Sequence, residues 1–150
     1  MNKPAFLYIT VIATTAEKLW EALTNPDITP RYFFGVRVES TWKVGDPVRY
    51  NAGDKITDEG VVLKCDPPRT LSYTFHHLKD EEMRGEKPSR VTFDITPEGQ
   101  AVRLTVTHDD FPEDSKVLPG ISEGWPLILS GLKTLLETGQ ELNLESTCDE

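Results

Sequence analysis

Three consecutive segments in the middle of the chain alternate apolar and polar side chains, and this alternation restricts the fold more than any other feature. Their apolar positions are Leu71, Tyr73 and Phe75, then Val91, Phe93 and Ile95, then Val102, Leu104 and Val106. A period of two residues is typical of β-strands with one buried and one solvated face. We therefore expect neighbouring strands of an antiparallel sheet, joined by hairpin connections.

Four further strands are predicted, which gives a curved antiparallel sheet of about six to seven strands. Their ranges are Ala5–Ile12, Val36–Trp42, Pro47–Tyr50 and Gly60–Cys65. The two prolines after Asp66 end the last of these strands, because proline cannot continue a ladder. Eight of the twelve residues from Lys79 to Arg90 are charged, which predicts a solvated hairpin tip.

Two short helices are expected directly after the first strand. Thr14 precedes Glu17 by three residues, the spacing of a capping box at a helix start. The apolar stripe of this helix consists of Ala16, Leu19, Trp20 and Leu23. Asn25 and Pro26 end it, and Pro26 suits the first turn of a short second helix.

A longer helix is predicted near the C-terminus. Its apolar stripe consists of Trp125, Ile128, Leu129, Leu132, Leu135 and Leu136, and Gly139 is its expected stop. An internal proline would remove a backbone hydrogen bond, so Pro126 is expected in the first turn, which gives a helix of about thirteen residues. This helix must cover the apolar face of the sheet, since both surfaces would otherwise stay exposed.

Length and charge restrict the possible partners. A chain of 150 residues is about one domain, expected at residues 1–139 with an acidic, flexible tail at 140–150. The net charge of −9 disfavours nucleic acid and anionic membrane surfaces as partners. No run approaches the roughly twenty apolar residues that a membrane-spanning helix needs, so membrane insertion is not expected.

The cysteines and the N-terminus favour a cytoplasmic location. Cys65 and Cys148 are too few for a disulfide scaffold, and we expect both to be reduced. The apolar stretch at the N-terminus has no small-residue cleavage site and runs directly into a helix signal, which argues against a signal peptide.

The predicted curvature of the sheet leaves space beneath the long helix. A sheet of about seven twisted strands curls, and one straight helix cannot fill its whole concave face. The remaining space is either packed with large side chains or open as a pocket for a small hydrophobic ligand. The candidate ligand-binding residues are Tyr50, Tyr73, Phe75, Phe93, Leu104, His108, Trp125, Leu129 and Leu132.

His108 is the best polar candidate on this face. It has the same parity as Leu104 and Val106, and its neutral ring could hydrogen-bond a ligand carbonyl or hydroxyl group. The alternative is a histidine at the rim of the sheet that bonds a loop carbonyl.

Two clusters combine histidine with aspartate, but neither predicts a metal site. They are His76, His77 and Asp80, and His108, Asp109 and Asp110. Neighbouring strand residues point to opposite faces, so His76 and His77 cannot easily share one ion. Without a nucleophile triad, a phosphate-binding loop or a marked carboxylate pair, we expect no metal, no cofactor and no catalytic residue.

Four segments carry a family resemblance through their order and spacing. They are Trp20–Pro26, Tyr32–Gly35, Gly60–Leu71 and Gly124–Glu137. Together they resemble the START-like (SRPBCC) superfamily, in the branch named after the activator homologue of the heat-shock protein 90 ATPase, over roughly residues 5–138. The resemblance implies the α+β helix-grip fold, in which a C-terminal helix lies across a curved antiparallel sheet. Pro126 departs from the helix-forming residues usual after the tryptophan.

Three functions follow as hypotheses. The resemblance implies that many relatives hold hydrophobic ligands between sheet and helix, which favours non-catalytic binding of a lipid-like or aromatic molecule. The second is an interaction protein that regulates a chaperone ATPase or another partner, although the eukaryotic activators resemble this chain over only one of their two domains. The third is an enzyme of the polyketide cyclase or hydrolase type that uses the same cavity.

Overall fold

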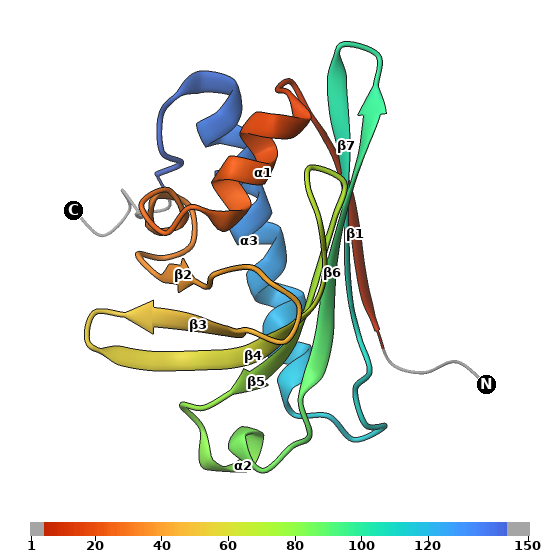
Figure 1. The fold of residues 1–150 in the computed structure, drawn as a ribbon. Coiled ribbons are helices and arrows are strands. Elements are labelled where there is room, and N and C mark those ends of the chain that lie inside the picture. Colours follow the sequence, from red (N-terminus) through yellow and green to blue (C-terminus); the bar gives the residue numbers. More distant parts are fainter. Residues whose placement is uncertain (1–4, 144–150) are drawn as a thin grey trace.

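The computed structural model describes residues 5–143, in which the strands form one antiparallel sheet in the order β1-β7-β6-β5-β4-β3-β2. The strands are β1 (Phe6–Ile12), β2 (Arg37–Glu39), β3 (Pro47–Ala52), β4 (Lys55–Asp66), β5 (Thr70–His77), β6 (Ser89–Glu98) and β7 (Ala101–Asp109). The helices are α1 (Ala16–Thr24), the 3-10 turn η1 (Thr29–Arg31), α2 (Glu81–Arg84) and α3 (Val117–Thr138). Figure 1 shows this order along the chain.

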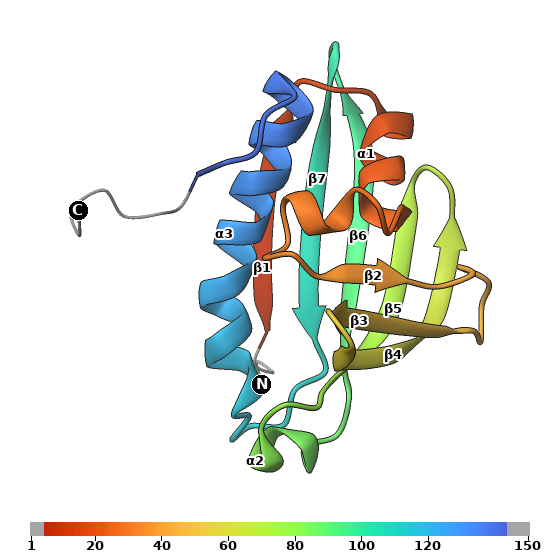
Figure 2. The same ribbon diagram turned by 90° about the vertical axis from the view of Figure 1, so that its left-hand side faces the viewer.

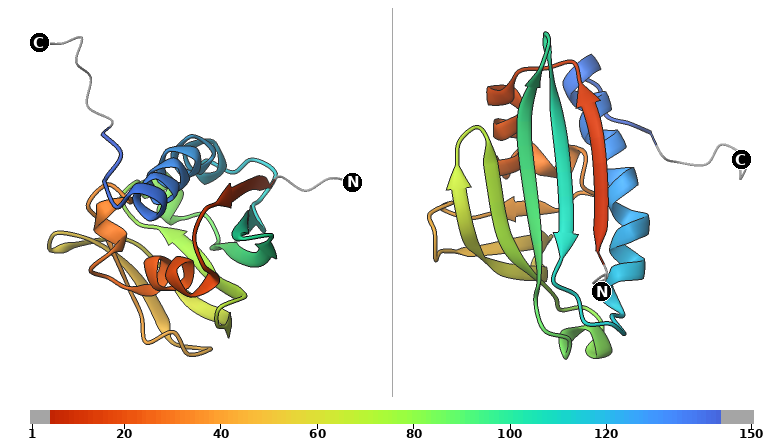
Figure 3. Two further views of the ribbon diagram at one scale, coloured as in Figure 1. Left: turned by 90° about the horizontal axis from the view of Figure 1, so that it is seen from above. Right: turned by 90° about the vertical axis from the view of Figure 1, so that its right-hand side faces the viewer.

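The sheet bends strongly, so that β2 and β3 run across the direction of β1 and β7 (Figure 2). Helices α1 and α3 lie on the concave side, and the opposite face of β1, β7 and β6 is uncovered (Figure 3). This arrangement confirms the predicted helix-grip fold, with a curved antiparallel sheet and a long C-terminal helix across it.

The alternating segments form β5, β6 and β7 as predicted. All nine of their predicted inward residues are buried. Phe93 of β6 pairs with Leu71 of β5 on one side and with Val106 of β7 on the other, so the apolar rows of three strands align. Strand register follows the buried pattern, because a shift by one residue would turn each row to the solvent.

Two strand predictions were wrong in extent. β4 begins at Lys55 instead of Gly60, after a tight turn in which Gly53 has a positive φ of 66°. β2 covers only Arg37–Glu39, and the chain then leaves the sheet and reaches Trp42 with a φ of 58°. The stretch from Lys55 to Glu59 is polar at both parities apart from one isoleucine, so it carries no alternating signal.

The first helix is capped one residue later than predicted. Thr15, not Thr14, is the N-cap, and its hydroxyl accepts a hydrogen bond from the Lys18 amide at 3.1 Å. α1 ends at Asn25 as expected. The short second helix is the 3-10 turn η1, which begins at Thr29 and uses Pro30 instead of Pro26 in its first turn.

The C-terminal helix is much longer than predicted, with 22 residues, and Pro126 lies inside it. The start lies at Val117, where the Ser115 hydroxyl accepts from the amides of Val117 and Leu118 at 3.2 and 3.1 Å. The missing bond at Pro126 is tolerated because α3 is buried on both sides of it, from Val117 to Leu135. Gly139 ends the helix with a φ of 78°, as predicted.

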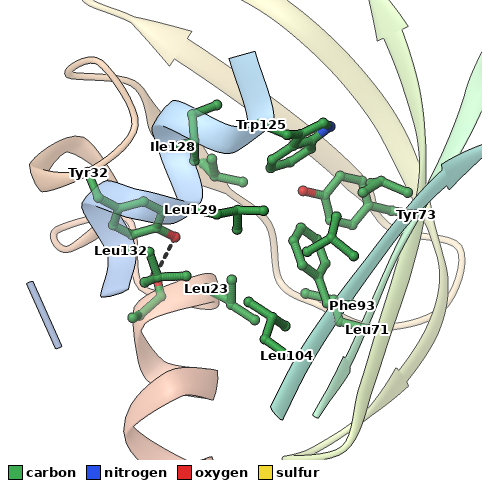
Figure 4. Close-up of a cluster of buried hydrophobic side chains, with 14 of the residues drawn as sticks. Leu23, Tyr32, Leu71, Tyr73, Phe93, Leu104, Trp125, Ile128, Leu129 and Leu132 are labelled. Atoms are coloured by element: carbon green, nitrogen blue, oxygen red, sulfur yellow. Dashed lines mark hydrogen bonds between the residues drawn. The ribbon is translucent and has the colours of Figure 1, made fainter. Parts of the chain in front are cut away.

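The centre of the molecule is a packed apolar core between sheet and helices. Figure 4 shows Tyr73, Phe93 and Leu104 from the sheet facing Trp125 and Leu129 of α3. Tyr32 joins the layers, since its hydroxyl donates to the Ala22 carbonyl at 2.7 Å. The core therefore fills most of the concave face with side chains.

The expected tail falls mostly outside the described residues. Residues 144–150, with Cys148, belong to the part of the chain that is not described. Cys65 is a free, partly buried thiol. The division into residues 1–139 and 140–150 stays a prediction. Between residues 5 and 143, no helix is long and apolar enough to cross a membrane.

Candidate functional site

An apolar cavity of about 360 Å³ lies at one end of the concave face, between the sheet, α2 and the N-terminal half of α3. Tyr50 and Phe75 line it from the sheet, Met83 from α2, and Trp125 from α3. Phe33, which precedes β2, completes the aromatic wall, with its ring edge-on to Tyr50 and Trp125 at centroid distances of 5.2 and 5.8 Å.

Two glycines of α3 keep the cavity open. Gly120 and Gly124 both line it, one helical turn apart. A Cβ atom at either position would meet no other heavy atom within 4 Å. The helix therefore presents bare backbone to the cavity at the place where other residues would project side chains. This pair was missed in the sequence, where residues 117–124 were not assigned to the helix.

The structure separates the nine predicted ligand-binding residues into three groups. Tyr50, Phe75 and Trp125 line the cavity. Tyr73, Phe93 and Leu129 border only an internal gap of about 10 Å³, too small for a ligand. Leu104, His108 and Leu132 are completely buried and lie outside both spaces.

Packing explains this separation. The part of α3 from Trp125 to Leu135 covers the middle of the concave face, where large side chains fill the space. The additional turns at its start, from Val117 to Gly124, border the cavity instead. Room is left only beyond the central core, where α3 carries its glycines. Of the two alternatives considered for the space under the helix, the packed core therefore applies at the centre and the open pocket at one end.

His108 is a structural histidine in a closed hydrogen-bond chain. The Trp125 indole donates to His108 Nδ1 at 3.0 Å, and the Ser89 hydroxyl donates to the Phe75 carbonyl at 3.2 Å. His108 Nε2 therefore carries the proton and donates to Ser89 Oγ at 2.7 Å. The structure thus places His108 away from the cavity lining, with its two ring nitrogens bonded to Ser89 and Trp125.

Burial keeps the His108 ring neutral. Desolvation lowers the pKa of His108 to about 3, against a small opposing effect of the Asp109 carboxylate. A second ring proton would also place two donors face to face at Nδ1, because the Trp125 indole can only donate.

Two tyrosine hydroxyl groups meet beside the cavity wall. Tyr50 Oη and Tyr73 Oη are 2.5 Å apart and buried. Burial raises the pKa of both phenols, so both stay protonated at neutral pH. They hold β3 and β5 together across the intervening strand β4.

The polar part of the cavity wall is a carboxylate–imidazole pair. Asp58 of β4 lies opposite His77 of β5, and Asp58 Oδ1 is 2.8 Å from His77 Nδ1. The Thr57 hydroxyl donates to Asp58 Oδ2 at 2.8 Å. Burial is the dominant influence on Asp58 and raises the pKa of its carboxyl group. Sequence reasoning missed Asp58, because it lies in the part of β4 that was not predicted.

The histidine–aspartate clusters separate in space. His76 Nε2 lies 2.7 Å from the Arg84 carbonyl, whereas His77 lines the cavity. Asp80 caps α2 by accepting from the Glu82 amide at 2.9 Å. Next to His108, the Asp109 carboxylate receives two bonds from Arg90, at 2.9 and 2.8 Å. Within residues 5–143, no three His, Cys, Asp or Glu side chains are grouped so as to hold a metal ion.

Solved structures from several organisms share this fold. A protein of Mesorhizobium loti is 28% identical, with a TM-score of 0.75 over 89% of this chain and 96% of that one. An HSP90 activator from Plasmodium falciparum is 20% identical, with a TM-score of 0.73 over 88% and 95%. CalU16 from Micromonospora echinospora is 18% identical, with a TM-score of 0.72 over 90% and 77%.

The comparison with protein families is more specific than these structural likenesses. No curated protein matches the chain. The family model described as activator of Hsp90 ATPase homolog 1-like protein matches residues 13–137, which include all strands but β1 and nearly all of α3. The resemblance noted in the sequence is thereby confirmed, and this chain belongs to the activator of Hsp90 ATPase homolog 1-like family.

Proposed function

We propose that this protein is a cytoplasmic, non-catalytic binding module for a small hydrophobic ligand, held in the cavity between β3–β5, α2 and α3. The observation that carries the proposal is the combination of volume and lining. Ligand sites in proteins range from about 300 to 1,000 Å³ and are mostly apolar with a few polar groups. The cavity of about 360 Å³ has this composition, with aromatic rings, Met83 and one polar pair.

The wall also has the adaptability that such a site needs. Met83 is an unbranched side chain that can adjust to different ligand shapes. It lies on α2, a single helical turn that carries no fully buried residue. A flat aromatic or short aliphatic molecule suits a small cavity bordered by Phe33, Tyr50 and Trp125.

Tryptophan fluorescence tests the proposal. Trp125 lines the cavity, while Trp20 and Trp42 do not. Titration with the neutral probe N-phenyl-1-naphthylamine is expected to quench tryptophan emission and to enhance probe emission, both with saturation.

A variant whose side chain fills the cavity, compared with a surface variant, tests where the probe binds. Gly124→Leu places a side chain into the cavity and is expected to weaken probe binding at least tenfold, since an occupied site excludes the ring. Glu123→Leu adds the same side chain at an exposed position of α3 and is expected to bind like the wild type. Saturable binding that is equally strong in both variants would place the probe elsewhere and contradict the proposal.

A second candidate function is regulation of a chaperone. The family match and the structural likeness to an HSP90 activator support it. An uncovered apolar row of β1, Leu7, Ile9 and Val11, offers a surface for a partner, with exposed fractions of 61%, 51% and 40%. Measuring the ATPase rate of an HSP90 with increasing amounts of this protein tests it, and an unchanged rate would contradict it.

A further inference from the structure

We propose that the Asp58–His77 pair forms the polar end of the cavity and binds a hydroxyl group, alcoholic or phenolic, on an otherwise apolar ligand. This inference rests on the proposed binding function and adds the chemical class of the ligand. The two side chains are brought to the cavity by paired positions of β4 and β5.

The contact with Asp58 determines which ring nitrogen of His77 is left for a ligand. Asp58 Oδ1 accepts from His77 Nδ1 at 2.8 Å, so Nδ1 carries the proton of the neutral ring. The lone pair is then on Nε2. Among the described residues, no hydrogen bond occupies His77 Nε2, and the His77 side chain is 25% exposed. The cavity thus offers one acceptor that is already oriented.

The carboxylate positions the ring and does not itself bind the ligand. Asp58 is only 7% exposed, and its two oxygens already accept from His77 and the Thr57 hydroxyl. A carboxylate that holds the other ring nitrogen fixes the tautomer and the orientation of the imidazole. His77 Nε2 is therefore a good acceptor for an O–H donor.

A neutral hydroxyl group fits this site better than an anionic head group. A ligand carboxylate beside Asp58 would bring two negative charges together in a mainly apolar environment, which is costly. The chain's net charge of −9 adds to this repulsion. A hydroxyl group donates to Nε2 without bringing a charge into the cavity.

Matched ligands test the inference on the wild-type protein. We expect 2-naphthol to bind about five- to tenfold more tightly than naphthalene, the ratio that one additional hydrogen bond gives. We expect 2-naphthoate to bind more weakly than 2-naphthol. Competition with N-phenyl-1-naphthylamine measures all three affinities under one condition.

Two variants test whether His77 is the residue that binds the hydroxyl group. In His77→Leu the ratio of naphthol to naphthalene affinity is expected to fall to about one, because the acceptor is lost while the apolar wall remains. His76→Leu is the matched control: His76 is the preceding residue, bonds the Arg84 carbonyl and does not line the cavity, so the ratio is expected to stay at the wild-type value. Naphthalene binding by each variant shows that its cavity is intact.

The outcomes separate this inference from the proposed function. Equal affinity for 2-naphthol and naphthalene in the wild type, or an unchanged ratio in His77→Leu, would overturn the hydroxyl site and leave the binding function in place. Tighter binding of 2-naphthoate would overturn it as well. Failure of every ligand and of the probe to bind would overturn both.

Discussion

Histidine is a residue type that often occurs in binding sites, but in this protein His108 is part of the packed core. Its inward parity was predicted, but parity does not tell which neighbours fill the space in front of the ring. Trp125 and Ser89 satisfy both ring nitrogens, so no hydrogen-bonding capacity is left for a ligand. His77 lies on β5, two strands away from β7, where the packed core ends, and no described residue bonds its second ring nitrogen.

The buried His108 gives a pH dependence of stability with a definite sign. Its folded pKa of about 3 lies below the unfolded value of 6.5, so the unfolded chain binds one more proton between these limits. The free energy of unfolding is expected to fall as the pH decreases below 6.5, by about 1.4 kcal/mol per pH unit from this group. Urea unfolding at pH 7.0, 6.0 and 5.0 measures it.

His108→Gln is the comparison for this pH dependence. Glutamine can accept from Trp125 and donate to Ser89, but it does not titrate. We expect the slope between pH 6.5 and 5 to be shallower than in the wild type by the contribution of one proton. The paired carboxylate Asp109, whose pKa is lowered, loses its contribution at lower pH and does not interfere in this window. Parallel slopes in the two proteins would show that His108 is not the source.

At the scale of elements, the α3 glycines keep space open at a cost in helix stability. Glycine in a helix interior is about 1 kcal/mol less favourable than alanine. Gly124→Ala is therefore expected to raise the free energy of unfolding by about 0.5–1 kcal/mol, since its Cβ meets nothing within 4 Å. Chemical denaturation of variant and wild type measures the difference.

Gly131 provides the contrast within the same helix. A Cβ there would lie 3.3 Å from the Tyr32 carbonyl oxygen, a tight contact that the backbone at Tyr32 would have to relieve by a small shift. We expect Gly131→Ala to be less stable than Gly124→Ala, although the helix-propensity gain is the same. Equal stabilisation by both would mean that α3 is not packed against Tyr32 as described.

The sequence predicted the central strands more accurately than the long helix. β5, β6 and β7 were predictable because each has one buried face, which imposes a period of two. The start of α3 was missed because Pro126 was assigned to a first turn. The better signals were Ser115, whose hydroxyl accepts from the first amides of the helix, and Pro119. Pro119 lies in the actual first turn, where the free amides need no helical partner.

At the scale of the whole molecule, the sequence predicted a space beneath the long helix, either packed or open, but not where an open part would lie. Curvature of the sheet implied leftover space, yet its location depends on where α3 starts and on which α3 residues lack side chains. Asp58 and Phe33 belong to the site through the bend of the sheet, which no local pattern encodes. Of the residues that line the cavity, the sequence analysis had named Tyr50, Phe75 and Trp125, which belong to apolar patterns of the strands and of α3.

Stability is expected to be uneven across the molecule. The strands β5, β6 and β7 carry the buried core, whereas α2 has no buried residue and borders the cavity. Amide hydrogen exchange is expected to be slowest in these strands and at least tenfold faster in α2, because short exposed elements open locally. Saturation with a cavity ligand is expected to slow exchange in α2 specifically. Uniform protection of α2 and the strands would contradict this picture.

The bare backbone of α3 at Gly120 and Gly124 lies apart from the side chains that hold the sheet and helices together. The size of the cavity and the stability of the fold therefore depend on different positions. Replacing these two glycines by alanine and then by valine is expected to reduce the cavity volume stepwise, while the residues of the core stay unchanged. Under the proposed binding function, these two positions are therefore expected to change ligand preference without changes to the core.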